Sequence, residues 1–265
     1  MKRFAQLTAA LLAVVPLSGV ANNEIRFCFE PQDYRPFTID SEDRVSFGNN
    51  GMLTDMIILA AREAGLRPQF ITRPWRRCIQ YLTNGEVDAI YAVIWKKERE
   101  QWAKFPMDGN IPNSNKRIWS VKYPIYTQSD RVIGWDGSKF TDKNLSISAP
   151  LGYVAHEKLK SLDTLAPSSY APEAGFKAVS RLRLDGYVVE ESIGDWLVSK
   201  LGLTGLISKD PKPFFIADWY VPLSHQWYGL NPKKAEAFWQ ALEEVRKVSG
   251  EKLYEQYRRV KTTTE

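Results

Sequence analysis

The stretch that most constrains the fold is residues 87–94, Val-Asp-Ala-Ile-Tyr-Ala-Val-Ile, in which a single residue carries a charge. A run this apolar is typical of a strand in a parallel sheet that is covered on both faces. Before it, the pattern predicts a strand at 24–30, a helix at 51–64, a short strand at 69–72 and a helix with Pro74 at its first position. The order β-α-β-α-β predicts an α/β lobe.

The rest of the chain repeats this alternation in a shorter form. Strands are predicted at 145–149 and 186–189, and helices end near residues 162, 182 and 201. A polar, proline-rich stretch at 209–213 then leads into a strand at 218–223. A helix begins at Pro232, and Gly250 is expected to end it before a last amphipathic helix.

This order predicts two α/β lobes, the second inserted into the first and joined to it by two crossings. We expect the first lobe to comprise residues 22–126 and 216–265, and the second to comprise residues 127–215. In such folds, ligands bind at the carboxyl ends of the strands and between the domains.

The N-terminus predicts export. Lys2 and Arg3 precede an apolar run at 9–20 and small residues up to Ala21, the pattern of a cleavable signal peptide over residues 1–21. An uncleaved membrane anchor is the alternative, and the shortness of the run argues against it. We therefore expect a periplasmic protein. Loss of Lys2 and Arg3 lowers the net charge from +5 to +3, which is too small to indicate nucleic-acid binding.

The chain has two cysteines, Cys28 and Cys78. An even number of cysteines in an exported protein predicts a disulfide, and only one pairing is possible here. Two buried free thiols are the alternative. The disulfide is favoured because both cysteines fall early in the same predicted lobe.

The sequence offers little for catalysis. His156 and His225 lie far apart, and neither has a carboxylate or cysteine at the spacing of a metal site. The chain also lacks the usual serine-hydrolase, zinc-protease, phosphate-loop and dinucleotide motifs. We predict no cofactor, no bound metal and no enzymatic activity.

Candidate binding residues follow the predicted strands of the first lobe. Arg99 comes shortly after the apolar strand, where its guanidinium could clamp a carboxylate, although it could also begin a solvated helix. Trp75 begins the second helix and is either a stacking wall or a core residue. Arg76 would lie at the mouth of the site, and Tyr34, in the loop after the first strand, could form the facing wall.

The second lobe adds two candidates. Gly152-Tyr153 lies between a strand and a helix, where free backbone N–H groups can bind an anion, or where the chain simply turns. Glu190 stands with Asp185 and Glu191 in an acidic set that could serve acid–base chemistry or a helix N-terminus.

Taken in order, these segments resemble the periplasmic solute-binding proteins of family 3, which have the type II periplasmic-binding-protein fold. The resemblance covers essentially the whole mature chain. It is carried by Tyr34-Arg35-Pro36-Phe37, Gly51-Met52-Leu53-Thr54-Asp55-Met56, Pro74-Trp75-Arg76-Arg77-Cys78, Gly85-Glu86-Val87-Asp88-Ala89-Ile90, Glu98-Arg99, Gly152-Tyr153, Arg183-Leu184-Asp185 with Glu190, and Pro222-Leu223-Ser224.

The resemblance implies a role for each candidate residue. Arg99 takes the position that clamps an amino acid's α-carboxylate, and Gly152-Tyr153 the helix start whose amides assist it. Glu190 takes the acidic position that receives the α-ammonium. Tyr34 and Trp75 match the aromatic pair that encloses the ligand's side chain.

One segment departs from the family pattern. Amino-acid binders usually carry small hydroxyl residues just before the arginine, whereas this chain has Ala92-Val93-Ile94-Trp95 in a segment one residue shorter. We expect Trp95 to fill space in the site and to select a smaller or flatter ligand.

The resemblance implies a monomeric receptor that captures a small polar, amino-acid-like solute and delivers it to the permease of an ABC transporter. An enzyme of the same fold, similar to cyclohexadienyl dehydratases, is a second possibility, with Glu190 as general acid. A sensor that docks a membrane receptor is a third.

Overall fold

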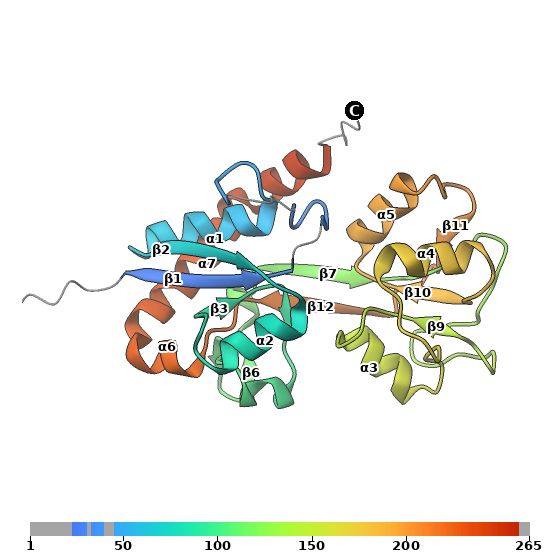
Figure 1. Cartoon of the computed structure of the whole chain (residues 1–265), viewed down its shortest axis with the longest axis horizontal. Helices are drawn as coiled ribbons and strands as arrows, with labels where there is room; N and C mark the ends of the chain where they lie inside the picture. Colours follow the sequence, from blue (N-terminus) through green and yellow to red (C-terminus); the bar gives the residue numbers. More distant parts are fainter. Residues whose placement is uncertain (1–22, 31–32, 40–44, 260–265) are drawn as a thin grey trace, which may run out of the picture.

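The computed structural model describes residues 23–30, 33–39 and 45–259, and its two α/β lobes lie side by side along the long axis of the molecule (Figure 1). The predicted signal peptide lies outside the described residues. Within the described part of the chain, the helices are all too short or too polar to cross a membrane.

The first lobe contains a parallel sheet with strand order β2-β1-β3. Its strands are β1 (Glu24–Phe29), β2 (Arg67–Thr72) and β3 (Ala89–Ile90). The crossovers are made by α1 (Met52–Glu63) and α2 (Trp75–Thr83), close to where the apolar periodicity predicted them. Pro74 is the N-cap of α2 and not its first residue, because its extended backbone lies outside the helical region.

The strand predicted at 87–94 is in fact broken in two. β3 pairs with β1, whereas β4 (Val93–Ile94) leaves that sheet and pairs antiparallel with β12 (Phe215–Tyr220). The break falls at Ala92, a non-glycine residue with a φ of 61°. Apolar periodicity could not reveal this turn, since residues on both sides of it are buried.

A second sheet of the first lobe has the order β4-β12-β7, with β7 spanning Trp119–Tyr123. β7 and β12 run antiparallel next to each other. β7 leads into the second lobe, and β12 returns from it (Figure 1). The chain crosses once after β7 and again before β12. The lobe boundaries predicted above remain predictions.

The second lobe is a mixed sheet with the order β11-β8-β10-β9. Its elements are β8 (Ile125–Gln128), β9 (Ile147–Ser148), α3 (Val154–Ser161), α4 (Pro172–Ser180), β10 (Gly186–Val188), α5 (Glu191–Lys200) and β11 (Ile207–Lys209). β9 is parallel to β10, so the chain must cross over between them, and α4 lies in this connection.

Short elements complete the first lobe. They are the 3₁₀ helices η1 (Lys97–Gln101) and η2 (Ser114–Lys116), the small hairpin β5 (Met107–Asp108) with β6 (Ile111–Pro112), and α6 (His225–Leu230). Their short lengths explain why sequence patterns did not predict most of them.

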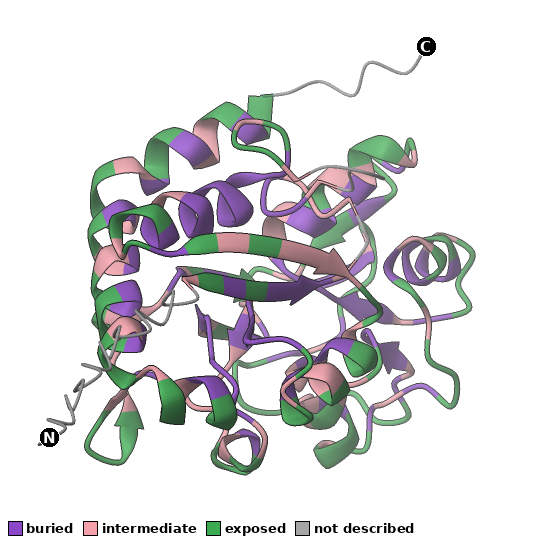
Figure 2. Cartoon of the chain, turned by 60° about the vertical axis from the view of Figure 1, so that its left-hand side comes forward, coloured by how far each residue is buried: buried purple, intermediate pink, exposed green. Residues whose placement is uncertain are grey.

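The C-terminal helix α7 runs unbroken over Pro232–Arg259, so the predicted end at Gly250 is wrong. Gly250 is buried against Trp119, and an added Cβ would lie 2.9 Å from the indole ring. The glycine therefore permits close packing inside the helix and does not terminate it. In Figure 2, α1 is largely buried, whereas α7 alternates between buried and exposed residues.

The predicted disulfide between Cys28 and Cys78 is confirmed, with an S–S distance of 1.94 Å. It joins the C-terminal end of β1 to the first turn of α2, and both cysteines are buried. The disulfide therefore fixes the helix that carries Trp75 against the strand that leads to the candidate site.

Candidate functional site

A cavity of about 80 Å³ lies between the two lobes. Six of the eight residues predicted for ligand binding line it, namely Tyr34, Trp75, Arg99, Gly152, Tyr153 and Glu190. Eight of its nineteen lining residues are aromatic and six are aliphatic. The structure thus brings together residues separated by more than 150 positions in the sequence.

Arg99 supplies the cavity's positive charge. Its side chain, only 9% exposed, comes from η1, and its Nη1 and Nη2 groups donate to the backbone carbonyls of Ile94 (3.1 Å) and Gly152 (3.4 Å). No ion pair joins it to a carboxylate of the described residues. Burial lowers the pKa of its guanidinium. A guanidinium with N–H groups to spare in a dry site is suited to bind a carboxylate.

Glu190 contributes a carboxyl group from the second lobe. It is the N-cap of α5, where its Oε2 accepts from the backbone N–H of Ile193 at 3.0 Å, and it is 3% exposed. Burial raises its pKa to about 8, even though the backbone hydrogen bonds act in the opposite direction. A cationic group beside it would favour the ionised carboxylate.

Glu30 is a second acid of the cavity, and sequence reasoning missed it. It directly follows β1 and accepts a hydrogen bond from the hydroxyl of Tyr153 in the other lobe. Burial raises its pKa. A lone glutamate at a strand end is usually solvated, so residue type alone did not single it out. Its position at a carboxyl end of the parallel sheet was the available signal.

The predicted aromatic pair is extended by a third ring. Trp75 packs against Tyr153 with ring centroids 6.2 Å apart and an interplanar angle of 63°. Tyr34 lines the same cavity. The Nε1 of Trp75 is buried without a hydrogen-bond partner among the described residues. An unpaired buried donor of this kind is costly.

The turn at Gly152-Tyr153 differs from the predicted amide site. The N–H of Tyr153 already donates to the carbonyl of Pro150 at 3.2 Å, and Gly152 (φ 85°) presents its carbonyl to Arg99. This segment therefore positions the Arg99 guanidinium and contributes the ring of Tyr153, and the Tyr153 amide is not free for an anion.

Two predicted residues do not line the cavity. Arg76 is exposed on the surface of α2. Trp95 packs against the cluster around the disulfide, and its Nε1 donates to Glu100 at 3.0 Å. The turn at Ala92 lets β4 pair with β12; Ile94 of β4 still lines the cavity, whereas Trp95, which follows it, packs on the opposite side. Trp95 therefore does not fill the site as its position in the sequence suggested.

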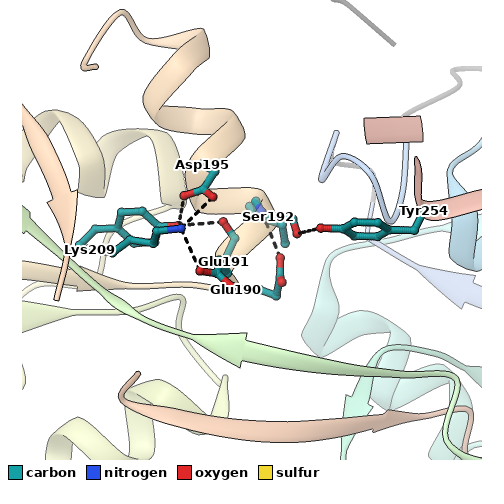
Figure 3. Close-up of polar contacts among 8 residues, drawn as sticks. Glu190, Glu191, Ser192, Asp195, Lys209 and Tyr254 are labelled. Carbon is teal, nitrogen blue, oxygen red and sulfur yellow. Dashed lines mark hydrogen bonds and ion pairs between the residues drawn. The ribbon is translucent and has the colours of Figure 1, made fainter. Parts of the chain in front are cut away.

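The lobes also touch at both edges of the cavity. Lys96 of the first lobe pairs with Glu157 of α3 at 2.5 Å. On another side, the hydroxyls of Ser192 in α5 and Tyr254 in α7 are 2.8 Å apart (Figure 3). Figure 3 also shows Glu190 at the start of α5, beside this contact. These contacts hold the lobes in a closed arrangement.

Among the described residues, no group of three or more His, Cys, Asp or Glu side chains could hold a metal ion. The groups that converge on the cavity are one guanidinium, two carboxyl groups and many aromatic rings. Such a set can bind a small molecule that carries both an acidic and a basic group.

Comparisons with known proteins agree with this geometry. Residues 25–118 match the model of the family described as bacterial extracellular solute-binding proteins, family 3, which confirms the predicted resemblance. No curated protein matches the sequence.

Solved structures match over most of the chain. A histidine kinase sensor domain with similarity to periplasmic binding proteins has a TM-score of 0.69 at 16% identity, covering 89% of this chain and 96% of its own. An ancestral amino acid-binding protein, described as a precursor of cyclohexadienyl dehydratase, gives 0.67 at 17% identity, covering 89% and 96%. The arginine-bound substrate-binding protein AbpA of an amino acid ABC transporter from Streptococcus pneumoniae gives 0.66 at 15%, covering 89% and 94%. The predicted type II periplasmic-binding-protein fold is thus confirmed.

Proposed function

We propose that this chain, whose residues 25–118 match the model of family 3 solute-binding proteins, captures a small amino-acid-like solute between its lobes. The solute carries a carboxylate and a cationic group, and the protein delivers it in the periplasm to an ABC permease. The observation that carries this proposal is Arg99, a buried guanidinium without a carboxylate partner among the described residues, in a cavity that both lobes line.

The charges support a zwitterionic ligand. A ligand carboxylate would accept hydrogen bonds from the Arg99 guanidinium, two of whose N–H groups bond to backbone carbonyls. A ligand cation would favour the ionised form of Glu190, whose pKa is raised to about 8 by burial. Because Arg99 and Glu190 belong to different lobes, one ligand that contacts both stabilises the closed state over the open one.

A thermal-shift screen of amino acids, N-alkylated amino acids and small carboxylates tests the proposal. A ligand at a hundred times its dissociation constant stabilises the folded state by about 2.7 kcal/mol, which raises the melting temperature by roughly two to four degrees. The same screen on Arg99→Ala gives the matched control. If no zwitterion stabilises the wild-type protein, or if hits stabilise Arg99→Ala equally, the proposal is contradicted.

A dehydratase-like enzyme is the second candidate, because a carboxyl group with a pKa of about 8 is protonated at neutral pH and could act as a general acid. Incubation of the purified protein with prephenate or arogenate decides between the two functions. Product formation that is lost in Glu190→Gln supports the enzyme, whereas stabilisation by a zwitterion without turnover supports the receptor.

A further inference from the structure

The two tryptophans of the cavity wall differ in whether their indole N–H has a partner. Trp219 donates its Nε1–H to the hydroxyl of Tyr123 at 2.9 Å. The Nε1 of Trp75 is one of four buried side-chain polar atoms that lack a hydrogen-bond partner among the described residues, and of these four residues only Trp75 lines the cavity. Folded proteins satisfy nearly all such groups, because an unpaired buried donor costs free energy. The Trp75 N–H therefore points to an acceptor that a bound molecule supplies.

The unpaired N–H lies under the opposite lobe. Trp75 begins α2 in the first lobe, and Gly152 lies just before α3 in the second. A Cβ added to Gly152 would lie 3.6 Å from Cδ1 and 3.9 Å from Nε1 of the indole, so Gly152 sits against this edge of the ring. An acceptor thus reaches Nε1 while the lobes are apart. Closure over an empty site leaves the N–H with neither water nor a protein partner.

Gly152 also connects Trp75 with Arg99. The carbonyl of Gly152 accepts from Arg99 Nη2 at 3.4 Å, so the guanidinium and the indole edge both lie at this one residue. A carboxylate accepts about four hydrogen bonds in all, so it can bind a guanidinium and one further donor. The indole N–H is a neutral donor, and it adds a hydrogen bond without burying a second charge.

We propose that Trp75 is a specificity-determining residue, whose indole N–H donates a hydrogen bond to the ligand carboxylate held by Arg99. This inference rests on the proposed function and deepens it. The sequence suggested a stacking wall or a core residue at Trp75, whereas in this arrangement the edge of the ring contacts the acidic group. A compound without an acceptor at this point leaves the N–H unpaired when the lobes close, so the site discriminates against it.

NMR of the indole N–H groups of the purified protein tests the inference with four probes, namely acetate, glycine, L-alanine and 4-aminobutyrate. The Trp75 resonance is identified by its loss in Trp75→Phe. We expect at least one probe to move the Trp75 indole proton downfield, because a hydrogen bond to a carboxylate deshields it.

Two other tryptophans are controls in the same spectrum. Trp219 lines the cavity with its N–H already paired, and Trp196 has an unpaired buried Nε1 but does not line the cavity. Neither resonance should move as far as that of Trp75. A probe that shifts Trp219 and leaves Trp75 in place, or that shifts all three equally, overturns the inference while the proposed function stands.

A spectrum that none of the four probes changes also overturns the inference. The proposed function is then decided separately, by the wider zwitterion screen and its Arg99→Ala control.

Substitution separates the donor from the ring. Trp75→Phe keeps an aromatic ring and removes the N–H, and we expect the affinity for the probe that shifts Trp75 to fall at least about tenfold by calorimetry. Trp196→Phe is the matched control and should bind that probe as the wild-type protein does. Unchanged affinity in Trp75→Phe contradicts the inference. Should Trp75→Phe not fold, Trp75→Met serves for the assignment and the wild-type spectrum decides.

A double-mutant cycle distinguishes a shared carboxylate from two independent effects. If the Trp75 N–H and the Arg99 guanidinium hold the same group, the loss of affinity in Trp75→Phe combined with Arg99→Lys should be smaller than the sum of the two single losses. Fully additive losses would contradict the inference.

Discussion

Charged residues near the two ends of strand β1 differ in whether they have a charged partner. At its beginning, Arg26 forms a two-point ion pair with Asp88, with Nε–Oδ2 and Nη2–Oδ1 distances of 3.0 and 2.8 Å. Asp88 also accepts from the backbone N–H of Arg26. Beyond the other end of β1 lies the cavity, where the guanidinium of Arg99 donates to two backbone carbonyls and has no ion pair with any of the described residues.

The difference separates structural charge from charge kept for a ligand. The Arg26 side chain is 46% exposed, yet its partner is fixed and nearly buried. Arg99 is much more buried and has no carboxylate partner among the described residues. Burying a charge without a counter-charge is costly, and a ligand carboxylate at Arg99 would offset that cost.

The largest expected effect is on binding by Arg99→Ala. Loss of a buried charge-assisted contact should weaken the best zwitterion of the thermal-shift screen by about 4 kcal/mol, roughly a thousandfold. The ligand-free variant loses two hydrogen bonds to backbone carbonyls and also the cost of burying a charge, so its melting temperature should change less than that of Arg26→Ala. Calorimetry and thermal unfolding measure the two effects.

Arg26→Ala is the matched control at the other end of β1. It should lower the melting temperature and leave the dissociation constant of the same compound unchanged. If Arg26→Ala weakens binding as much as Arg99→Ala does, the distinction between structural and ligand-binding arginines fails.

Removal of the disulfide comes next. The double variant Cys28→Ala, Cys78→Ala opens a loop of 50 residues and should lower the free energy of unfolding by about 4 kcal/mol. Urea unfolding with the wild-type protein in and out of reductant checks this value. If the variant loses free energy of unfolding but the reduced wild-type protein does not, packing of the sulfur atoms, and not the crosslink, stabilises the fold.

Asp88→Asn tests the structural pair directly. The amide removes the negative charge that holds Arg26 and weakens the acceptor of three N–H groups, so we expect a loss of about 2 kcal/mol in the free energy of unfolding. Urea titration measures it, and ligand affinity should stay the same. Unchanged stability would mean that the pair contributes as little as an exposed surface ion pair.

The effect that is smallest per pH unit is a pH dependence set by Glu190. Its pKa is about 8 in the folded protein against an ordinary value of 4.5, so the folded state holds this proton more tightly than the unfolded chain. Stability of the ligand-free protein should therefore be greatest at low pH and fall as the pH rises towards 8, by at most about 1.4 kcal/mol per pH unit.

Glu190→Gln should flatten that pH dependence, whereas Glu86→Gln, at an exposed position, should keep it. Thermal unfolding between pH 5 and 9 gives the comparison. An identical pH profile for the wild-type protein and Glu190→Gln would rule out Glu190 as its source.

Local sequence patterns predicted much of the fold of the first lobe. Alternation and apolar runs predicted β1, α1, β2 and α2 to within a few residues, because each of these elements buries one regular face or stripe. The cysteine count predicted the disulfide, since one pairing was possible. The position of Arg99 after a buried strand was also enough to select it as a candidate for the site.

Other features depended on contacts between distant segments. The break at Ala92 follows from pairing of β4 with β12, more than 120 residues later, and it decides that Trp95 points away from the cavity. Gly250 could not be told from a helix end until Trp119 was seen against it. Glu30 became part of the site only because closure of the lobes brings Tyr153 to it.

The sequence by itself thus determined the α/β alternation, the disulfide, two of the three charged residues of the cavity and three of its eight aromatic residues. Only the tertiary structure decided which of those charges have partners. The reason is physical: residue type and spacing fix how a segment folds locally, whereas burial and charge compensation depend on what the rest of the chain places around it. The unpaired state of Arg99, on which the proposed function depends, is a property of that arrangement.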